Sequence, residues 1–472
     1  MAKQQKRSAA GRKPVVAAAY LLADADCRRI AEQIFKLSDA DETEVRVDSV
    51  TDALTRFANN TIHQNVAEQG ASISVRTVFD GRTARATTNK TDEESLRRVV
   101  ATSTELARRQ PKNRNLLPMP GRQKYPAVRR YFEATAAATP ADRARVVARV
   151  VKSAAGRGQT AAGIFSTGAM ESVIANSQGL FAAYRQTRAE FSVTMMQDTA
   201  AAGNSLGSSG WAKANAPDIR ALDPLALAGS AGQKAALSRA PRELTPGRYT
   251  VILEPAATLD LVGFLFYDFA ATAVMDRRSC LNNRVGKKIF GENISLWDDA
   301  THPLQLGAPF DGEGMPRQKV LLVDRGVPRN LVYSRATARR LRKRATGHAL
   351  ALPSEWGEAP MNLVLEGGGS SVEQMIQSTE RGILLTRVWY IREVDPYEKV
   401  LTGMTRDGTF LVEDGRVVCG IRNFRFNQSL LEMLSNVEQL GPAARAAGEE
   451  AFEMVVPAMK VRNFHFTEVT KF

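Results

Sequence analysis

Histidine is scarce in this sequence, and the spacing of its histidines does not form a zinc site. The 472 residues include four histidines, His63, His302, His348 and His465. Zinc-dependent hydrolysis needs about three protein ligands and a water, commonly two histidines one helical turn apart with a glutamate as general base. No two of these histidines lie within a helical turn of each other, and none has a glutamate next to it. We therefore expect no complete catalytic zinc site in this chain.

Two short segments in the second half still combine residue types that could do chemistry. Asp311 and Glu313 have the spacing of paired carboxylates, but the prolines and glycines around them favour loop ordering over acid–base catalysis. His348 follows Thr346-Gly347, where the simplest interpretation is a histidine bonded to backbone at a glycine turn. The alternative is that it lines a cleft. The candidate cleft-lining residues are Asp311, Glu313, Thr346, Gly347 and His348, and we expect no catalytic or metal-binding residue in this chain.

The three cysteines indicate a reducing compartment rather than a disulfide framework. Cys27, Cys280 and Cys419 lie far apart, their number is odd and no CxxC pair occurs. Cys280 and Cys419 lie in apolar surroundings, where a thiol usually serves as a small buried hydrophobe. Residues 1–13 lack the apolar core of a secretory signal, and no apolar run approaches the roughly 18 residues of a membrane span. We therefore expect a cytoplasmic protein without a membrane segment.

The net charge of +14 comes mostly from two short segments. Residues 1–13 carry five Lys or Arg side chains and residues 335–344 carry six, with no acidic residue in either segment. We expect the first segment to be a disordered, solubilising tail. The second segment is either the solvated face of a helix or a contact for an acidic partner. Nucleic-acid binding is the weaker interpretation, because no zinc finger, ribonucleoprotein motif or helix-turn-helix accompanies the charge.

Capping and periodicity signals place these residues on an α+β framework. The expected helices of the first half are 24–37, 92–109 with a capping box of Thr91 and Glu94, 140–155, and 224–237. The expected strands are 44–50, a hairpin over 71–87 and a β-rich stretch over 160–197. The second half reads as an apolar helix near 259–273 followed by short strands, with hairpins at 319–333 and 409–421 and a last strand at 459–466.

Turn residues near 245–247 separate these two parts. We predict a basic tail over residues 1–13, an N-terminal α/β domain with an antiparallel sheet and helices over residues 14–243, and a β-rich C-terminal domain over residues 244–472. Short strands at this spacing are typical of a sandwich or barrel-like β domain.

Several segments resemble one known family. Residues 56–64 read RFANNTIHQ, residues 309–314 read PFDGEG and residues 346–349 read TGHA. Further matching segments are 286–290 (GKKIF), 297–299 (WDD), 336–341 (ATARRL), 401–403 (LTG), 410–415 and 430–441. In this order they resemble the TldD/PmbA family of peptidase-related proteins. PFDGEG and TGHA are most similar to the PmbA branch, also called TldE. The chain departs from the family pattern at Arg406-Asp407, at Gly420 and at residues 367–370.

The resemblance also identifies what this chain lacks. Where catalytic members of the family carry a zinc-binding HExxxH helix, residues 263–273 read GFLFYDFAATA, with no histidine. The resemblance implies a non-catalytic subunit of a heterodimeric peptide-processing metalloprotease, whose TldD-like partner carries HExxxH and holds the zinc. The alternatives are a homo-oligomeric peptide-binding protein of the same fold, forming a homodimer when isolated, or a nucleic-acid-associated regulator of the gyrase-modulator type.

Overall fold

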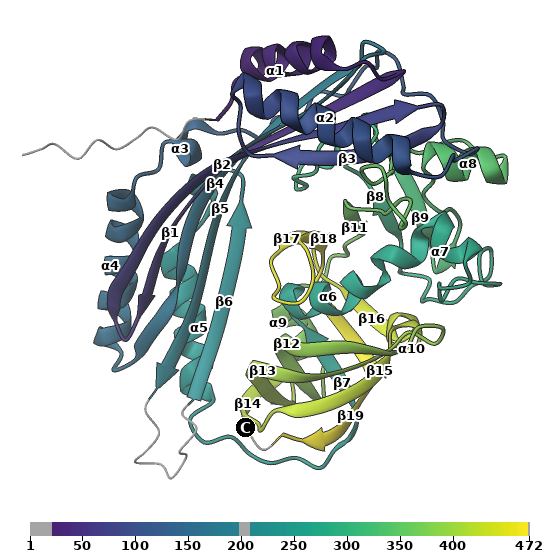
Figure 1. The fold of residues 1–472 in the computed structure, drawn as a ribbon. Helices are drawn as coiled ribbons and strands as arrows, with labels where there is room; N and C mark the ends of the chain where they lie inside the picture. The colour runs from purple at the N-terminus through teal and green to yellow at the C-terminus, as the bar shows by residue number, and fades with distance from the viewer. Residues whose placement is uncertain (1–20, 198–207, 471–472) are drawn as a thin grey trace, which may run out of the picture.

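The computed structural model describes residues 21–197 and 208–470, which form an N-terminal half and a C-terminal half (Figure 1). A long curved sheet with helices makes the N-terminal half, and a β-rich half follows it. The fold is therefore α+β, as predicted. The predicted basic tail at residues 1–13 lies outside the described residues, and the division near residue 244 stays a prediction. None of the described helices combines the length and the apolar composition that a membrane crossing requires.

The N-terminal half contains one antiparallel sheet in the order β3-β2-β1-β4-β5-β6. Its strands are β1 (Glu42–Ala58), β2 (Thr61–Phe79), β3 (Arg82–Thr88), β4 (Thr160–Asn176), β5 (Phe181–Gln197) and β6 (Ser208–Ala216). The prediction of a short strand at 44–50 was wrong, because β1 continues for 17 residues. It then turns at Asn59-Asn60, whose φ angles of 51° and 58° suit the tight turn of a hairpin.

Helices cover one face of this sheet, which we call the outer face. They are α1 (Asp24–Leu37), α2 (Glu93–Arg109), α3 (Glu133–Ala136), α4 (Pro140–Gly156), the short 3₁₀ helix η2 (Ile219–Ala221) and α5 (Pro224–Leu237). α1 and α2 pack against Val45, Val75 and Val173, and a second apolar cluster that includes α4 and α5 contains Phe165 and Phe191. The predicted capping box of α2 was wrong: Asp92 is the N-cap and accepts from the Ser95 N–H at 2.9 Å, one residue after Thr91.

A five-stranded barrel forms the base of the C-terminal half. Its strands are β7 (Gly247–Leu253), β12 (Arg381–Asp395), β13 (Val400–Glu413), β15 (Phe424–Ser429) and β19 (Met459–Val469), with β14 (Arg416–Gly420) and β16 (Val437–Leu440) at its margins. Pairing of β12 with β13 closes the circle. The predicted hairpin at 409–421 is confirmed as β13–β14, which turns at Asp414-Gly415, both with positive φ.

A second sheet lies between the barrel and the N-terminal half (Figure 1). In spatial order it contains β10 (Val327–Pro328), β9 (Val320–Asp324), β8 (Leu296–Asp298), β11 (Leu363–Leu365), β18 (Met454–Val456) and β17 (Ala444–Ala446). Three further short helices belong to this half: α8 (Arg335–Leu341), α9 (Val372–Gln377) and α10 (Leu430–Ser435). α9 packs on β7 and β14, and α10 packs on β15 and β19 of the barrel. The hairpin predicted at 319–333 forms as β9–β10, although β10 has only two residues.

The apolar helix predicted near 259–273 is not one helix. It consists of α6 (Pro255–Val262), the 3₁₀ helix η3 (Gly263–Phe269) and α7 (Ala271–Met275). Ala270 between the last two has extended backbone with ψ of 128° and pairs with Val332, which interrupts the helical ladder. The helical segment is therefore interrupted at Ala270.

Candidate functional site

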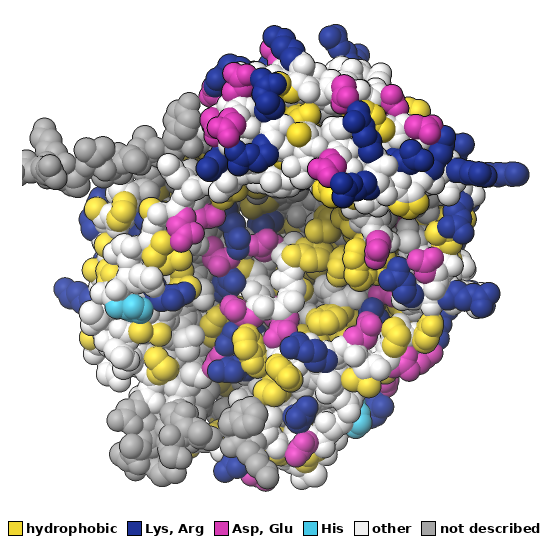
Figure 2. Space-filling model, viewed as in Figure 1, with side chains coloured by type: hydrophobic (Ala, Val, Ile, Leu, Met, Phe, Trp, Pro, Cys, Tyr) yellow, Lys and Arg dark blue, Asp and Glu magenta, His cyan; other side chains and the backbone are white. Residues whose placement is uncertain are grey.

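The face of the molecule in Figure 2 is hollowed between the N-terminal sheet and the C-terminal half, and charged side chains lie inside the hollow. Side chains alternate between the two faces of a strand, so residues next to those that pack on the helices point to the opposite, inner face. The inner face carries acidic and basic side chains from four strands: Asp52, Glu68, Arg188, Glu190 and Lys213. The inner face is therefore polar around these residues, whereas elsewhere on it Ala182 and Tyr184 join an apolar cluster with Phe310. The outer face is largely apolar.

A loop from the C-terminal half reaches this inner face. It joins β17 to β18, covers residues 447–453 (AGEEAFE) and is called the acidic loop below. Its Glu453 pairs with Arg188 at 2.6 Å and accepts from Asn215 at 3.1 Å. The Lys213 ammonium donates to the carbonyl of Gly448 at 3.1 Å. The acidic loop thus links the two halves across the hollow through charged and polar contacts.

Asp260 of α6 holds the acidic loop in place. Its fully buried carboxylate accepts from the backbone N–H groups of Glu449, Glu450 and Ala451 at 3.0–3.2 Å. Burial raises the pKa of Asp260 to about 6, although these three hydrogen bonds oppose the rise. A side chain at Gly448 would place its Cβ 2.1 Å from an Asp260 oxygen, so only glycine fits here without a shift. Asp260 is therefore fully occupied as an anchor of the loop.

The 3₁₀ helix η3 presents aromatic side chains. Phe266 of η3 packs edge-to-face on Phe452 of the acidic loop with ring centroids 5.2 Å apart. Tyr267 packs on Trp356 at 4.8 Å, and the Arg278 guanidinium lies within 5.7 Å of both rings. Trp356 is 55% exposed, so this aromatic group reaches the surface.

Asp268, the second acid of residues 255–269, is also held in structural contacts. It is buried and pairs with the Lys399 ammonium at 2.6 Å, and Lys399 pairs with Glu393 at 2.5 Å. Burial raises the pKa of Asp268, and Lys399 opposes this rise. Asp268 also accepts from the Cys280 N–H at 2.8 Å, and burial together with this carboxylate raises the pKa of the Cys280 thiol. Cys280 is therefore a buried thiol and not a prepared nucleophile, as the sequence predicted.

The four histidines lie in separate parts of the fold. His63 is on β2, His302 follows β8, His348 lies between α8 and β11, and His465 is on β19. Among residues 21–197 and 208–470, no group of three or more His, Cys, Asp or Glu side chains is placed to hold a metal ion. Residues 263–273 contain no histidine, and their one acid, Asp268, is paired with Lys399.

His348 is fully buried and bonded to side chains rather than to backbone. Its Nε2 lies 2.9 Å from Asp298 Oδ1, and its Nδ1 lies 3.0 Å from the Thr346 hydroxyl. Although burial acts to raise the pKa of Asp298, its interactions with His348, Arg317 and the Asn362 N–H hold this pKa below its usual range. An ionised carboxylate can only accept, so Nε2 carries the proton of this bond. Asp298 also accepts from the Asn362 N–H at 2.8 Å, which ties β8 to the start of β11.

Asp311 and Glu313 lie in one tight loop next to this histidine. Asp311 accepts from the N–H groups of Glu313, Met315 and Ala349, each at 2.9 Å, so it orders the loop as the sequence predicted. Burial raises its pKa. Burial and the nearby Asp311 raise the pKa of Glu313 to about 7, although Arg335 lies 3.5 Å from its carboxylate.

The five candidate residues therefore meet in one place, but mostly in the interior. Four of them are buried and Thr346 is partly buried, so they support loops rather than line an open cleft in this conformation. The WDD, PFDGEG and TGHA segments all contribute to this network. Asp298 also belongs to this network, although the sequence analysis did not select it as a candidate. It could have been found from the WDD segment, of which it is the central residue.

The basic segment at residues 335–344 is largely solvated. It forms α8 and the turn after it, where Arg339, Arg340, Arg342, Lys343 and Arg344 are exposed. Arg335 alone points inward, toward Glu313. This exposure fits both alternatives, a solvated helix face and a contact for an acidic partner.

Known proteins share this fold over nearly the whole chain. The structure of TldE from Thermococcus kodakarensis superposes with a TM-score of 0.84 at 21% identity, covering 93% of this chain and 99% of that one. A Thermotoga maritima protein described as a modulator of a DNA gyrase superposes with a TM-score of 0.82 at 18% identity, covering 93% and 100%. At these identities the likeness concerns the fold.

Sequence comparison extends this likeness to a family. The metalloprotease PmbA of Escherichia coli O157:H7 is 24% identical over 231 residues, which are 48% of each chain. The alignments cover about half or less of the length of each curated relative. Profiles of the PmbA/TldA metallopeptidase match as domain 1 at residues 43–107, the central domain at 124–239 and the C-terminal domain at 246–468. Together they match well over half of the sequence, and the chain belongs to the PmbA/TldD metallopeptidase family.

Proposed function

We propose that this chain is the non-catalytic, TldE-like subunit of a two-chain cytoplasmic metallopeptidase that acts on peptides. The zinc ion and the general base belong, in this proposal, to a TldD-like partner that carries HExxxH. The proposal rests on the contacts that the acidic side chains of residues 255–269 make. Both carboxylates there, Asp260 and Asp268, are occupied as structural anchors, and the rest of the segment is apolar, aromatic or hydroxylated.

The edge of β2 supports a role in handling extended peptides. Residues 61–72 pair with β1 on one side, and β3 begins pairing only at Ile73. Along the described part of the chain, no strand pairs with the other edge of residues 61–72. Most of these residues are exposed, and none is Lys, Arg or Pro, the residues that commonly protect an edge. Extended peptides bind such edges by adding a strand.

The test is co-expression with an HExxxH-bearing relative from the same genome, with a tag on this chain only. The proposal expects co-elution on size exclusion, zinc in the complex, and peptide cleavage by the complex that this chain alone does not show. A homo-oligomer that ignores the relative would instead favour a peptide-binding protein without protease coupling. Tight DNA binding that falls steeply with salt would favour the nucleic-acid regulator.

A further inference from the structure

Arg143 on the first turn of α4 is a fully buried cation without an acidic partner. Its Nη1 donates to the Ala138 carbonyl at 3.2 Å and to the Thr167 hydroxyl at 2.8 Å, and its Nε donates to the Thr55 hydroxyl at 3.4 Å. Among the described residues Arg143 forms no ion pair, and its Nη2 has no hydrogen-bond partner. Burial lowers the pKa of the guanidinium, and the neighbouring Asp142 opposes this only in part.

A buried charge of this kind is costly unless something compensates it. Arginine cannot lose its proton in a protein, so Arg143 stays cationic even where burial disfavours the charge. Its acceptors are two hydroxyls and a carbonyl, which carry only partial charge. The usual compensation for a buried cation is a carboxylate or another anion nearby.

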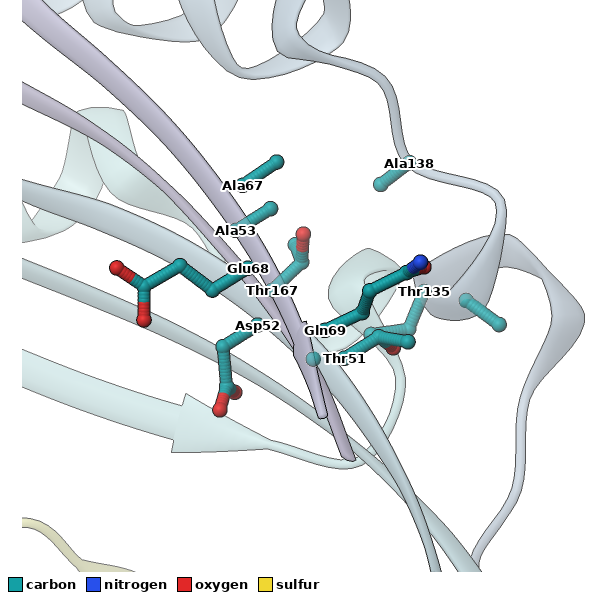
Figure 3. Close-up of a pocket in the computed structure, with 11 residues that line it drawn as sticks. Thr51, Asp52, Ala53, Ala67, Glu68, Gln69, Thr135, Ala138 and Thr167 are labelled. Carbon is teal, nitrogen blue, oxygen red and sulfur yellow. The ribbon is translucent and has the colours of Figure 1, made fainter. Parts of the chain in front are cut away.

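A cavity of about 320 Å³ lies next to two of the residues that bond this guanidinium, Ala138 and Thr167 (Figure 3). Ala138 and Thr167, the two residues that accept from Arg143 Nη1, both line it. The other lining residues are mostly small or polar: Thr51, Asp52, Ala53, Ala67, Glu68, Gln69, Thr135, Ala136 and Gly168. The cavity has the size of a site for a small organic molecule.

The hydroxyl of Thr167 connects the cation to the cavity. Its oxygen accepts from Arg143, so its own proton is available to a second acceptor, and no described residue receives it. A hydroxyl polarised in this way is a good donor to an anion. The methyl groups of Ala53, Ala136 and Ala138 supply apolar walls beside this donor.

Asp52 and Glu68 also border the cavity, but their carboxylates point away from Thr135 and Ala138. Figure 3 shows Asp52 and Glu68 directed to the opposite side of the strands from Thr135 and Ala138. Asp52 interacts there with Arg188 of the inner face, while burial raises its pKa. Thr167 lies on the outer face with Arg143, so an anion bound to it is separated from both carboxylates by the sheet.

We propose that this outer-face cavity binds a small carboxylate with a short hydrocarbon body. The carboxylate accepts from the Thr167 hydroxyl and compensates the charge of Arg143, while the hydrocarbon part contacts the alanine methyl groups. The site lies on the face of the sheet opposite the hollow, so it is independent of the proposed peptidase role.

Isothermal titration calorimetry on the full chain tests this site with benzoate and benzamide, two probes of nearly equal shape. We expect one benzoate site per chain, with benzamide binding at least about tenfold more weakly, because only benzoate gains a charge-assisted hydrogen bond. Equal binding of the two probes, or no benzoate binding at millimolar concentration, would overturn the proposal.

Three variants and one control locate the site. Thr167→Val keeps the shape but removes the donor, and we expect benzoate binding to weaken at least about tenfold. Arg143→Met removes the charge and should abolish the preference for benzoate over benzamide. Ala53→Leu fills the cavity and should abolish binding of both probes, which keeps the test decisive if Arg143→Met fails to fold. Arg149→Met, an exposed position on the same helix, should bind like the unmodified chain. Unchanged benzoate binding in Thr167→Val and Ala53→Leu would refute the site.

Discussion

Among the contacts between the N-terminal sheet and the C-terminal half, two differ clearly in burial. The first, which we call the buried contact, centres on Glu44, which pairs with Arg76 at 2.8 Å and with Arg85 at 2.5 Å. Arg85 also donates to the Leu352 carbonyl at 2.6 Å. The second is the acidic loop, where Arg188 and Glu453 pair while 48% and 29% exposed. Buried pairs are hard to break, whereas exposed pairs are weak and screened by salt. We therefore expect the buried contact to be harder to break than the contact made by the acidic loop.

The largest expected effect is the loss of Glu44. Glu44→Ala leaves Arg76 and Arg85 without their shared carboxylate, and we expect the free energy of unfolding to fall by about 3–5 kcal/mol. Denaturant unfolding measures this change. The matched control is Glu93→Ala, which removes an exposed helix pair with Arg97 and should cost less than about 0.5 kcal/mol. Similar losses for the two variants would contradict the contrast between buried and exposed pairs.

The same region should show a pH dependence through Glu313. Its pKa is about 7 in the folded chain against an ordinary value of 4.5, so the folded state binds more protons in that interval. This contribution to stability is full below about pH 4.5 and is lost as pH rises toward 7. In the unmodified chain this effect lowers the free energy of unfolding between pH 5 and pH 8. We expect the decrease to be about 2 kcal/mol smaller in Glu313→Gln, measured at these two pH values. An unchanged pH slope would contradict the burial of this carboxylate.

The acidic loop should depend on its anchor more than on its charges. Gly448→Ala forces the loop away from Asp260, and we expect a loss of about 1–3 kcal/mol together with faster proteolysis within residues 447–453. Gly369→Ala, where an added Cβ meets no atom within 4 Å, should leave both unchanged. Unchanged stability and proteolysis in Gly448→Ala would show that Asp260 does not hold the loop.

The smallest effect belongs to the exposed pair itself. Glu453→Gln removes the charge that Arg188 meets across the hollow, and we expect a loss of about 0.2–1 kcal/mol at low salt that shrinks at 1 M salt. Thermal unfolding at the two salt concentrations checks it. A large loss that salt does not reduce would place this contact in the same class as the buried one.

Local signals predicted much of the fold and little of these contacts. The residue types Asp414-Gly415 correctly predicted a tight turn. Asn59-Asn60 are also typical of such a turn, but the predicted strand at 44–50 ended before them, so the β1–β2 hairpin was not predicted. The broken α6–η3–α7 segment depends on a backbone contact between Ala270 and Val332, which no local pattern encodes. The same limit applies to the site, because His348 meets Asp298 from 50 residues away and Asp260 meets the acidic loop from about 190 residues away.

The central claim is that this chain supplies no zinc chemistry of its own but completes a partner that does. The most direct measurement is zinc content and peptide cleavage for three samples: this chain alone, the HExxxH-bearing relative alone, and the two purified together. The account predicts no stoichiometric zinc and no cleavage for this chain alone, and greater cleavage by the pair than by the relative alone. One bound zinc per chain and peptide cleavage by this chain in isolation would contradict it.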